Sequence, residues 1–259
     1  MRKVTGIGGA NQVTWTSGEK GTRSASTFVL LHGAGSTPWY WHLVAPQLAA
    51  AGHNVVAVEF PVEDDTRGLD GYAAVAVEAI GSRSGLTLVA QSMAAYTAPI
   101  VATMLPVELI VLVAPMVPAP GETPGQWWAN TGQPDAARRY AIEHGREPDK
   151  PFDPIETFLH DVDPAVADEA GAHVRRQSDR PFDDPWPLRQ WPDVRTRCVI
   201  GRDDRLFPLD FQRRVVRERL GIIPDEINAG HLPALSRPED LTRLLVGYCA
   251  DAQAKGRPE

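Results

Sequence analysis

A serine stands where an apolar run meets a helical pattern, in the segment Leu88–Ala95. This serine is Ser92, and two small residues, Ala90 and Ala94, stand two positions before and two positions after it. A sharp turn between a strand and a helix needs small residues at both positions, and it exposes the hydroxyl as a nucleophile at the sheet edge. The helix N-terminus that follows would supply amide donors for a developing oxyanion. A serine that only caps a helix would be placed in the same way, so both interpretations stay open for this motif.

An earlier strand pattern ends in a His-Gly turn, at His32 and Gly33 within the segment Phe28–Gly35. Such a turn can aim a backbone N–H at the point where an oxyanion forms, and the N–H of Met93 would supply the second donor. The alternative is a glycine turn that only leads into the next helix. The glycines are needed in either case.

Two further segments carry groups that could activate a serine. The apolar run Cys198–Gly201 leads into an acidic turn that contains Asp203 and Asp204, and His231 stands in the loop after the last strand pattern. A histidine can take the proton of a serine, and a carboxylate can orient that histidine. The order Ser, Asp, His along the chain is the one expected of a serine hydrolase in which the nucleophile lies on a strand-turn-helix.

The elements that must position these groups alternate along the chain. Short apolar runs, typical of strands covered on both faces, lie at Ser26–Leu31, Asn54–Glu59, Leu86–Ala90, Leu109–Ala114, Arg197–Gly201 and Asp225–Asn228. Helical patterns lie between them, for example at Trp39–Ala51, with Thr37 as its cap, and at Leu209–Leu220. The alternation predicts an α/β fold with a mostly parallel, doubly wound sheet and helices on both faces.

Residues 118–191 interrupt this alternation. The stretch Pro118–Pro192 holds 12 of the 23 prolines and four of the seven tryptophans, with short helical patterns near Asp135–His144 and Pro164–Gln177. A structureless loop of this size is uncommon in a compact domain, and the tryptophans argue against a disordered linker. Because Ser92 precedes the segment while the acidic turn and the histidine follow it, the chain must leave one sheet and return to it. We expect a core of residues 1–117 and 192–259 and an inserted helical lid of residues 118–191.

In this order and context, the four motifs resemble those of the α/β-hydrolase family, and the likeness covers most of the chain. The resemblance implies that Ser92 is the nucleophile and His231 the base. It implies that the acid is Asp204, the last residue of the Gly-x-x-Asp pattern, with Asp203 as the alternative.

The same resemblance assigns the oxyanion hole to the backbone N–H groups of Ala34 and Met93. The stretch Val113–Glu122 is similar to the branch of small-molecule methyl esterases and hydroxynitrile lyases. The lyases of that branch typically have Lys after the catalytic His and Thr in the His-Gly turn, whereas this chain has Leu232 and Gly33. We therefore expect ester hydrolysis rather than cyanohydrin cleavage.

Two features depart from the family pattern. Ala90 and Ala94 replace the usual glycines and could displace Ser92, and Pro99 removes one hydrogen bond from the following helix. Neither change removes a catalytic group. The expected function is a carboxylesterase for small apolar esters. The alternatives are a non-hydrolytic member of the fold, such as a lyase or a cofactorless perhydrolase, and a ligand-binding receptor that retains the pocket.

An aromatic lid over a serine site would form a wall of an apolar substrate pocket. The residues expected to line it are His32, Gly33, Trp127, Trp128 and Leu232. For His32 and the two tryptophans, packing inside the protein is the alternative role. No metal is expected, because the cluster of His160, Asp161 and Asp163 lacks further convergent ligands. No cofactor is expected, since the glycines at Gly6–Gly9 lack the spacing and the preceding strand of a dinucleotide site.

The composition limits the partners. With 26 basic and 33 acidic side chains the net charge is −7, which does not suit a nucleic-acid or anionic-membrane binder. The most apolar stretch is interrupted by prolines, whereas a membrane span needs about 20 mostly apolar residues. No secretory signal is recognised. We expect a cytoplasmic protein that acts on a small-molecule ester, and the sequence leaves its oligomeric state open.

Overall fold

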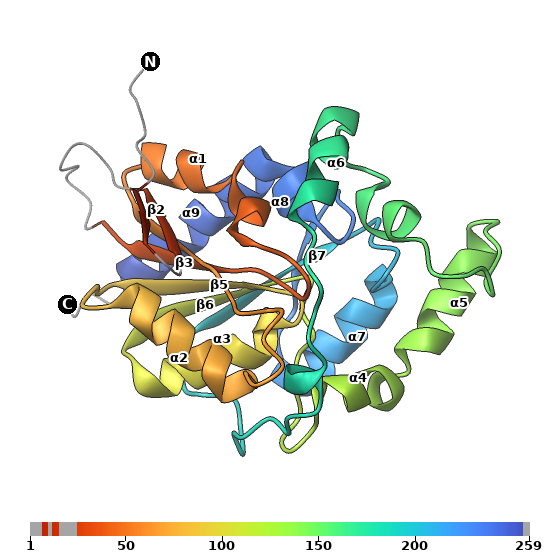
Figure 1. The fold of residues 1–259 in the computed structure, drawn as a ribbon, viewed down its shortest axis with the longest axis horizontal. Coiled ribbons are helices and arrows are strands. Elements are labelled where there is room, and N and C mark those ends of the chain that lie inside the picture. The colour runs from red at the N-terminus through yellow and green to blue at the C-terminus, as the bar shows by residue number, and fades with distance from the viewer. Residues whose placement is uncertain (1–6, 10–11, 16–24, 256–259) are drawn as a thin grey trace.

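An eight-stranded sheet forms the centre of the protein (Figure 1). The computed structural model describes residues 7–9, 12–15 and 25–255. In spatial order the strands are β1 (Ile7–Gly9), β2 (Gln12–Trp15), β4 (Asn54–Val58), β3 (Thr27–Leu31), β5 (Leu86–Gln91), β6 (Val107–Val113), β7 (Thr196–Gly201) and β8 (Asp225–Ile227). The pairings from β4 to β8 are parallel, whereas β1 with β2 and β2 with β4 pair antiparallel. The predicted α/β fold with a mostly parallel sheet is confirmed.

The six predicted strands are observed to within two residues at each end, whereas β1 and β2 are not predicted. Strand β1 is made of an isoleucine and two glycines, and β2 has four residues of which two are polar. Neither contains the apolar run that identifies a buried strand. These two strands extend the sheet at its edge, and β4 and β3 lie between them and β5, the strand that leads to the candidate nucleophile.

Helices cover both faces of the sheet and create two apolar cores. One face is covered by α2 (Leu69–Ile80), α3 (Ala94–Met104) and α7 (Leu209–Leu220). The other face is covered by α1 (Ala45–Ala50), α8 (Pro233–Ser236) and α9 (Pro238–Lys255). Successive residues of a strand point to opposite faces, so in β3 Val29 belongs to the first core and Phe28 to the second. Both are fully buried, which fixes the position of the strand ends that carry the site.

The prediction of one helix over Trp39–Ala51 is wrong. The structure has a short 3-10 helix, η1 (Pro38–Trp41), followed by turns and then by α1. Pro46 in the first turn of α1 explains the break, because within a continuous helix its ring would clash with an earlier carbonyl and it has no amide to donate. The predicted cap is confirmed, since the hydroxyl of Thr37 accepts a hydrogen bond from Trp39 N at 3.3 Å.

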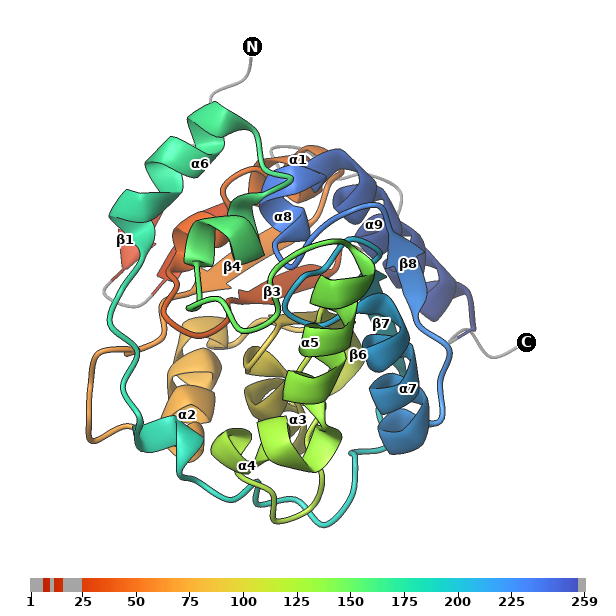
Figure 2. The same cartoon turned by 90° about the vertical axis from the view of Figure 1, so that its right-hand side faces the viewer.

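Residues 118–191 contain short helices joined by irregular chain. These are α4 (Pro124–Thr131), α5 (Gln133–Glu143), the π-helix η2 (Ile155–Leu159), α6 (Pro164–Ala170), η3 (Gly171–His173) and η4 (Arg180–Phe182). The helix expected over Pro164–Gln177 therefore ends earlier, at His173, and the following residues are extended. In Figure 2 α4, α5 and α6 lie in front of the sheet. Hydrogen bonds from the segment to the loops after β3, β7 and β8 place it at the carboxyl edge of the sheet, and they are made by Gln177, by Gln133 of α5 and by Asp161.

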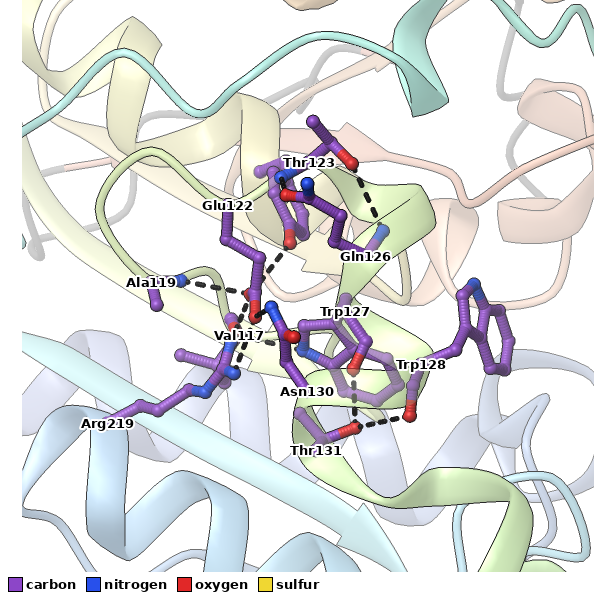
Figure 3. A network of polar contacts seen from close by, with 11 residues as sticks. Val117, Ala119, Glu122, Thr123, Gln126, Trp127, Trp128, Asn130, Thr131 and Arg219 are labelled. Carbon is purple, nitrogen blue, oxygen red and sulfur yellow. Dashed lines mark hydrogen bonds and ion pairs between the residues drawn. The ribbon is translucent and has the colours of Figure 1, made fainter.

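The start of this segment is fixed by one buried carboxylate, that of Glu122 (Figure 3). Its oxygens form a two-point ion pair with Arg219 of α7, and they accept hydrogen bonds from Tyr96 of α3 at 3.1 Å and from Asn130 of α4 at 2.9 Å. The amide of Ala119 donates a further bond of 3.2 Å. Burial alone would raise the pKa of Glu122, but the bonds from Arg219 and Asn130 outweigh it and lower that pKa. The segment is thereby joined to two helices of the first core.

Candidate active site

Ser92 lies on a strained turn between β5 and α3. Its φ is +53°, a left-handed conformation that costs a non-glycine residue on the order of 1–3 kcal/mol. The turn is held by backbone bonds from Ser92 N to Val113 O at 3.0 Å and from Met116 N to Ser92 O at 3.1 Å. The residue at the N-cap of α3 is Met93, and no side chain caps this helix. The hydroxyl of Ser92 is thus not used as a helix cap and is free for another contact.

The two alanines beside the serine fit into the turn. Ala90 is completely buried at the end of β5, and Ala94 is 2% exposed in the first turn of α3. Pro99 lies inside α3, which continues beyond it to Met104. The departures from the family pattern are therefore accommodated by the surrounding packing.

Three side chains from separate loops form a hydrogen-bonded line. His231 Nε2 lies 3.2 Å from Ser92 Oγ, and His231 Nδ1 lies 2.9 Å from Asp204 Oδ2. A carboxylate only accepts, so Nδ1 carries the proton and Nε2 is left to accept the hydroxyl proton of the serine. Asp203, the alternative acid, has an exposed side chain, and its backbone amide donates to Ala229 O at 3.1 Å.

The carboxylate of Asp204 is fully buried and surrounded by donors. Its Oδ1 accepts hydrogen bonds from the amides of Leu206 and Phe207 at 2.9 and 2.8 Å. Its Oδ2 also lies 3.3 Å from the Nε2 of Gln212, a residue of α7. These bonds fix the carboxylate opposite His231 and stabilise its charge. Gln212 is absent from the sequence prediction. It stands four residues before Val216, on the buried stripe of α7, and this spacing is the signal that could have identified it.

The His-Gly turn packs directly against the nucleophile turn. A Cβ at Gly33 would lie 2.2 Å from Gln91 Oε1 and 3.1 Å from Ser92 Cβ, so only glycine fits without displacement. Among the described residues, the amides of Ala34 and Met93 have no hydrogen-bond acceptor. Both are therefore free to bind a negatively charged oxygen.

His32 is a packing residue rather than a pocket wall. It is 1% exposed, its Nδ1 bonds Gly33 O at 2.9 Å, and its Nε2 accepts from Phe60 N at 3.3 Å. Burial lowers the pKa of His32 to about 4, and the bond to Gly33 opposes this only in part. The ring is neutral and joins the end of β3 to the chain that follows β4.

Aromatic rings surround the candidate histidine. Phe207 packs edge-on against His231 with 4.9 Å between ring centroids, and Phe158 of η2 lies at 5.5 Å. Trp127 is fully buried behind Phe207 and donates its indole N–H to Val117 O, so it supports this wall from inside. Trp128 is partly exposed, with its ring 5.8 Å from that of Phe207. The two phenylalanines are absent from the sequence prediction, since nothing in the pattern distinguishes them from core residues.

Of the remaining expected pocket residues, Leu232 is partly exposed directly after His231. The cluster around His160 and Asp161 lies beside the histidine loop, where Asp161 Oδ2 accepts from Gly230 N at 2.7 Å. Within the described residues, no group of three or more His, Cys, Asp or Glu side chains could hold a metal ion. Of the helices that the structure describes, none is long and apolar enough to cross a membrane.

Comparison with known proteins identifies the family. The model of the alpha/beta hydrolase family matches residues 28–244, and the chain belongs to this family, as its motifs indicated. Methylesterase 7 from Arabidopsis thaliana is 25% identical over 256 residues, which are 85% of this chain and 94% of that relative. The solved structure of polyneuridine aldehyde esterase superposes with a TM-score of 0.70 at 19% identity, over 87% of this chain and 99% of the other. A pyrethroid hydrolase from Sphingobium faniae JZ-2 gives 0.68 at 22% identity, over 90% and 100% of the two chains.

Proposed function

We propose that the protein is a serine hydrolase that cleaves small, apolar carboxylic esters through an acyl-enzyme. The observation that carries this proposal is the continuous line of hydrogen bonds from Ser92 through His231 to Asp204. A relative named as a methylesterase supports the same reaction class.

In the proposed reaction, Ser92 Oγ attacks the acyl carbonyl while His231 Nε2 takes its proton. Asp204 keeps the proton of the histidine on Nδ1 and stabilises the imidazolium that forms. The imidazolium then gives its proton to the leaving alcohol. A water molecule, deprotonated by His231 in turn, attacks the acyl-enzyme; the bond to Ser92 Oγ breaks, His231 returns the proton to that oxygen, and the carboxylic acid is released.

The proposed oxyanion hole consists of the backbone N–H groups of Ala34 and Met93. Neither amide has an acceptor among the residues that the structure describes, and the two belong to the turns that pack together at Gly33 and Ser92. Loss of one such donor typically lowers kcat by about 10²–10³. The helix N-terminus of α3 adds a partial positive charge behind Met93.

Residues 118–191 are proposed to act as the lid of a core formed by residues 1–117 and 192–259. Phe158 of this segment and Phe207 of the core both pack against His231. Trp128, also from the segment, lies beside Phe207. An apolar wall of this kind favours substrates with an apolar acyl or alcohol part.

Hydrolysis of p-nitrophenyl esters of increasing acyl length tests the reaction, and a fluorophosphonate probe tests the nucleophile. We expect turnover to be fastest for the short and medium chains and to disappear, together with labelling, in Ser92→Ala. The matched control is Ser82→Ala, which changes an exposed serine in the turn after α2 and should leave both readouts at the wild-type level. Full labelling of Ser92→Ala would disprove the assignment. Tight ligand binding without turnover of any ester would instead favour a receptor.

A further inference from the structure

The turn after β3 is held on both sides of Ala34, whose own amide has no acceptor in the described part of the chain. On one side, His32 Nδ1 donates to Gly33 O at 2.9 Å. On the other side, the amide of Gly35 donates to Oε1 of Gln177 at 2.9 Å. Gln177 stands 142 residues further along the chain, within residues 118–191, which are called the insertion below. The direction of the Ala34 N–H therefore depends on one core side chain and one side chain from the insertion.

The backbone of the insertion reinforces this contact. Arg175 N donates to Gly35 O at 2.8 Å, so both the amide and the carbonyl of Gly35 bind the stretch 175–177. Gly35 has a φ of +62°, and a Cβ on it would lie 3.1 Å from Arg175 O. Glycine is therefore needed at this position for its conformation and for the close approach of the two chains.

Gln177 is itself held in place. Its Nε2 donates to the hydroxyl of Tyr72 at 3.2 Å and to Ser178 O at 2.9 Å, which fixes the amide so that Oε1 points at Gly35. Tyr72 stacks on Phe60 with 4.9 Å between centroids, and Phe60 N donates to His32 Nε2 at 3.3 Å. His32 and Gln177 are therefore connected to each other through Phe60 and Tyr72. The two ends of this chain of contacts bind Gly33 and Gly35, the residues on either side of Ala34.

We propose that Gln177 is a positioning residue for the oxyanion hole, because its bond to the Gly35 amide aims the neighbouring Ala34 amide at the reacting carbonyl. This inference rests on the proposed esterase function. It implies that the oxyanion hole is complete only while residues 175–177 bind the turn after β3. When they leave this turn, the amide of Ala34 loses its orientation.

Three variants test the inference. Gln177→Met keeps the length of the side chain and removes the acceptor for Gly35 N–H. Gln177→Glu keeps an acceptor. Tyr72→Phe removes one of the bonds that hold Gln177, from the core side. The matched control is Gln126→Met, which changes another glutamine of the insertion, one that only caps α4 through Thr123 (Figure 3).

For each variant we would measure kcat and KM on a p-nitrophenyl ester, and the rate ratio between an oxygen ester and its thionoester. The ratio reports the oxyanion hole directly, because only the atom that the donors bind is changed. For Gln177→Met we expect kcat to fall roughly 10–100-fold with KM changed less than about threefold, and the ratio to fall as well. Gln177→Glu should retain more of kcat than Gln177→Met, Tyr72→Phe should show a smaller loss with the same signature, and Gln126→Met should match the wild type.

Wild-type kcat and an unchanged ratio in Gln177→Met would overturn the inference. So would a loss that appears in KM alone, because that is the result expected if Gln177 only holds the insertion over the substrate. If Gln177→Met does not fold, the rate ratio between the oxygen ester and the thionoester is measured in Tyr72→Phe instead, and an unchanged ratio there overturns the inference. A wild-type protein that neither hydrolyses esters nor reacts with a fluorophosphonate would overturn the proposed function, and this inference with it, whereas an active wild type with an unaffected variant contradicts the inference alone.

Discussion

The carboxylate of Glu122 and the guanidinium of Arg219 form a two-point ion pair between residues 97 positions apart in the sequence. The side chain of Glu122 is 4% exposed and that of Arg219 is 16% exposed. The same arginine also donates to Val117 O, directly before the insertion starts. The pair therefore fixes the position at which the chain leaves the sheet, and its loss should affect the stability of the whole fold.

Glu122→Gln tests this role. A neutral amide cannot balance Arg219, and breaking a buried ion pair on one side typically costs about 3–5 kcal/mol. We expect the free energy of unfolding in urea at pH 7 to fall by that amount. The lowered pKa of Glu122 means that its contribution is present above the unfolded-state pKa of 4.5 and is lost as the pH falls below it, so the variant and the wild type should converge in acid. Glu78→Gln, on the exposed face of α2, is the control and should change little. An unchanged free energy in Glu122→Gln would contradict the prediction.

The sequence predicts the groups that are tied to strand ends. Ser92, the Gly33 turn and His231 each follow a recognisable strand pattern, and parallel strands bring their carboxyl ends to one edge. For these three groups the local pattern is informative because each lies within a few residues of a regular element. The acidic turn is different, because local pattern leaves Asp203 and Asp204 open and only the family resemblance favours Asp204, which is the one that lies 2.9 Å from His231 Nδ1.

The residues that support these groups could not be predicted in the same way. Asp161 reaches the histidine loop from 69 residues away, and Gln177 reaches the His-Gly turn from 142 residues away. Both lie in the insertion, where no regular period relates sequence to position. The same holds for Phe158, which lies on a π-helix, a rare element with no sequence signature here.

His32 should make the stability of the protein depend on pH. Its folded pKa of about 4 is below the unfolded value of 6.5, so in acid the unfolded chain binds a proton that the folded protein excludes. As far as His32 is concerned, the free energy of unfolding keeps its full value above pH 6.5 and decreases as the pH falls towards 4. Between pH 7 and pH 5 this decrease should be about 2 kcal/mol. Urea unfolding at both pH values measures it. His32→Asn, whose side-chain amide can still reach Gly33 O, should show a smaller difference between the two pH values, and an equal difference would rule out this histidine as the cause.

The two aspartates of the acidic turn should differ sharply in their effect on activity. Asp204→Asn leaves the size of the side chain unchanged but no longer holds the proton of His231 on Nδ1, and kcat is expected to fall about 10⁴-fold. Asp203→Asn changes an exposed side chain and should stay within about twofold of the wild type. Steady-state hydrolysis of one p-nitrophenyl ester by both variants provides the comparison. If the larger loss occurred in Asp203→Asn, the proposed acid would be wrong.

The loop that carries His231 packs tightly against the insertion at Gly230. A Cβ at this position would lie 2.7 Å from Asp161 Oδ1 and 2.9 Å from His160 Nε2, both of which are buried atoms. The amide of Gly230 also donates to Asp161 Oδ2 at 2.7 Å. The loop and the insertion are thus in contact at a point next to the proposed base.

Gly230→Ala should therefore separate the two chains. Because the added methyl group has no space, Asp161 must move away from the Gly230 amide, and His231 should lose its alignment with Ser92. A misplacement of about 1 Å can cost on the order of 10²-fold in rate, so we expect kcat to fall by roughly that factor while circular dichroism still reports a folded protein. Gly247→Ala is the matched control, since a Cβ there meets no atom within 4 Å in the exposed face of α9, and a helical alanine should raise stability by about 0.5–1 kcal/mol without changing kcat. Wild-type kcat in Gly230→Ala would mean that the insertion yields to the added methyl group and that its contact with this loop does not align His231.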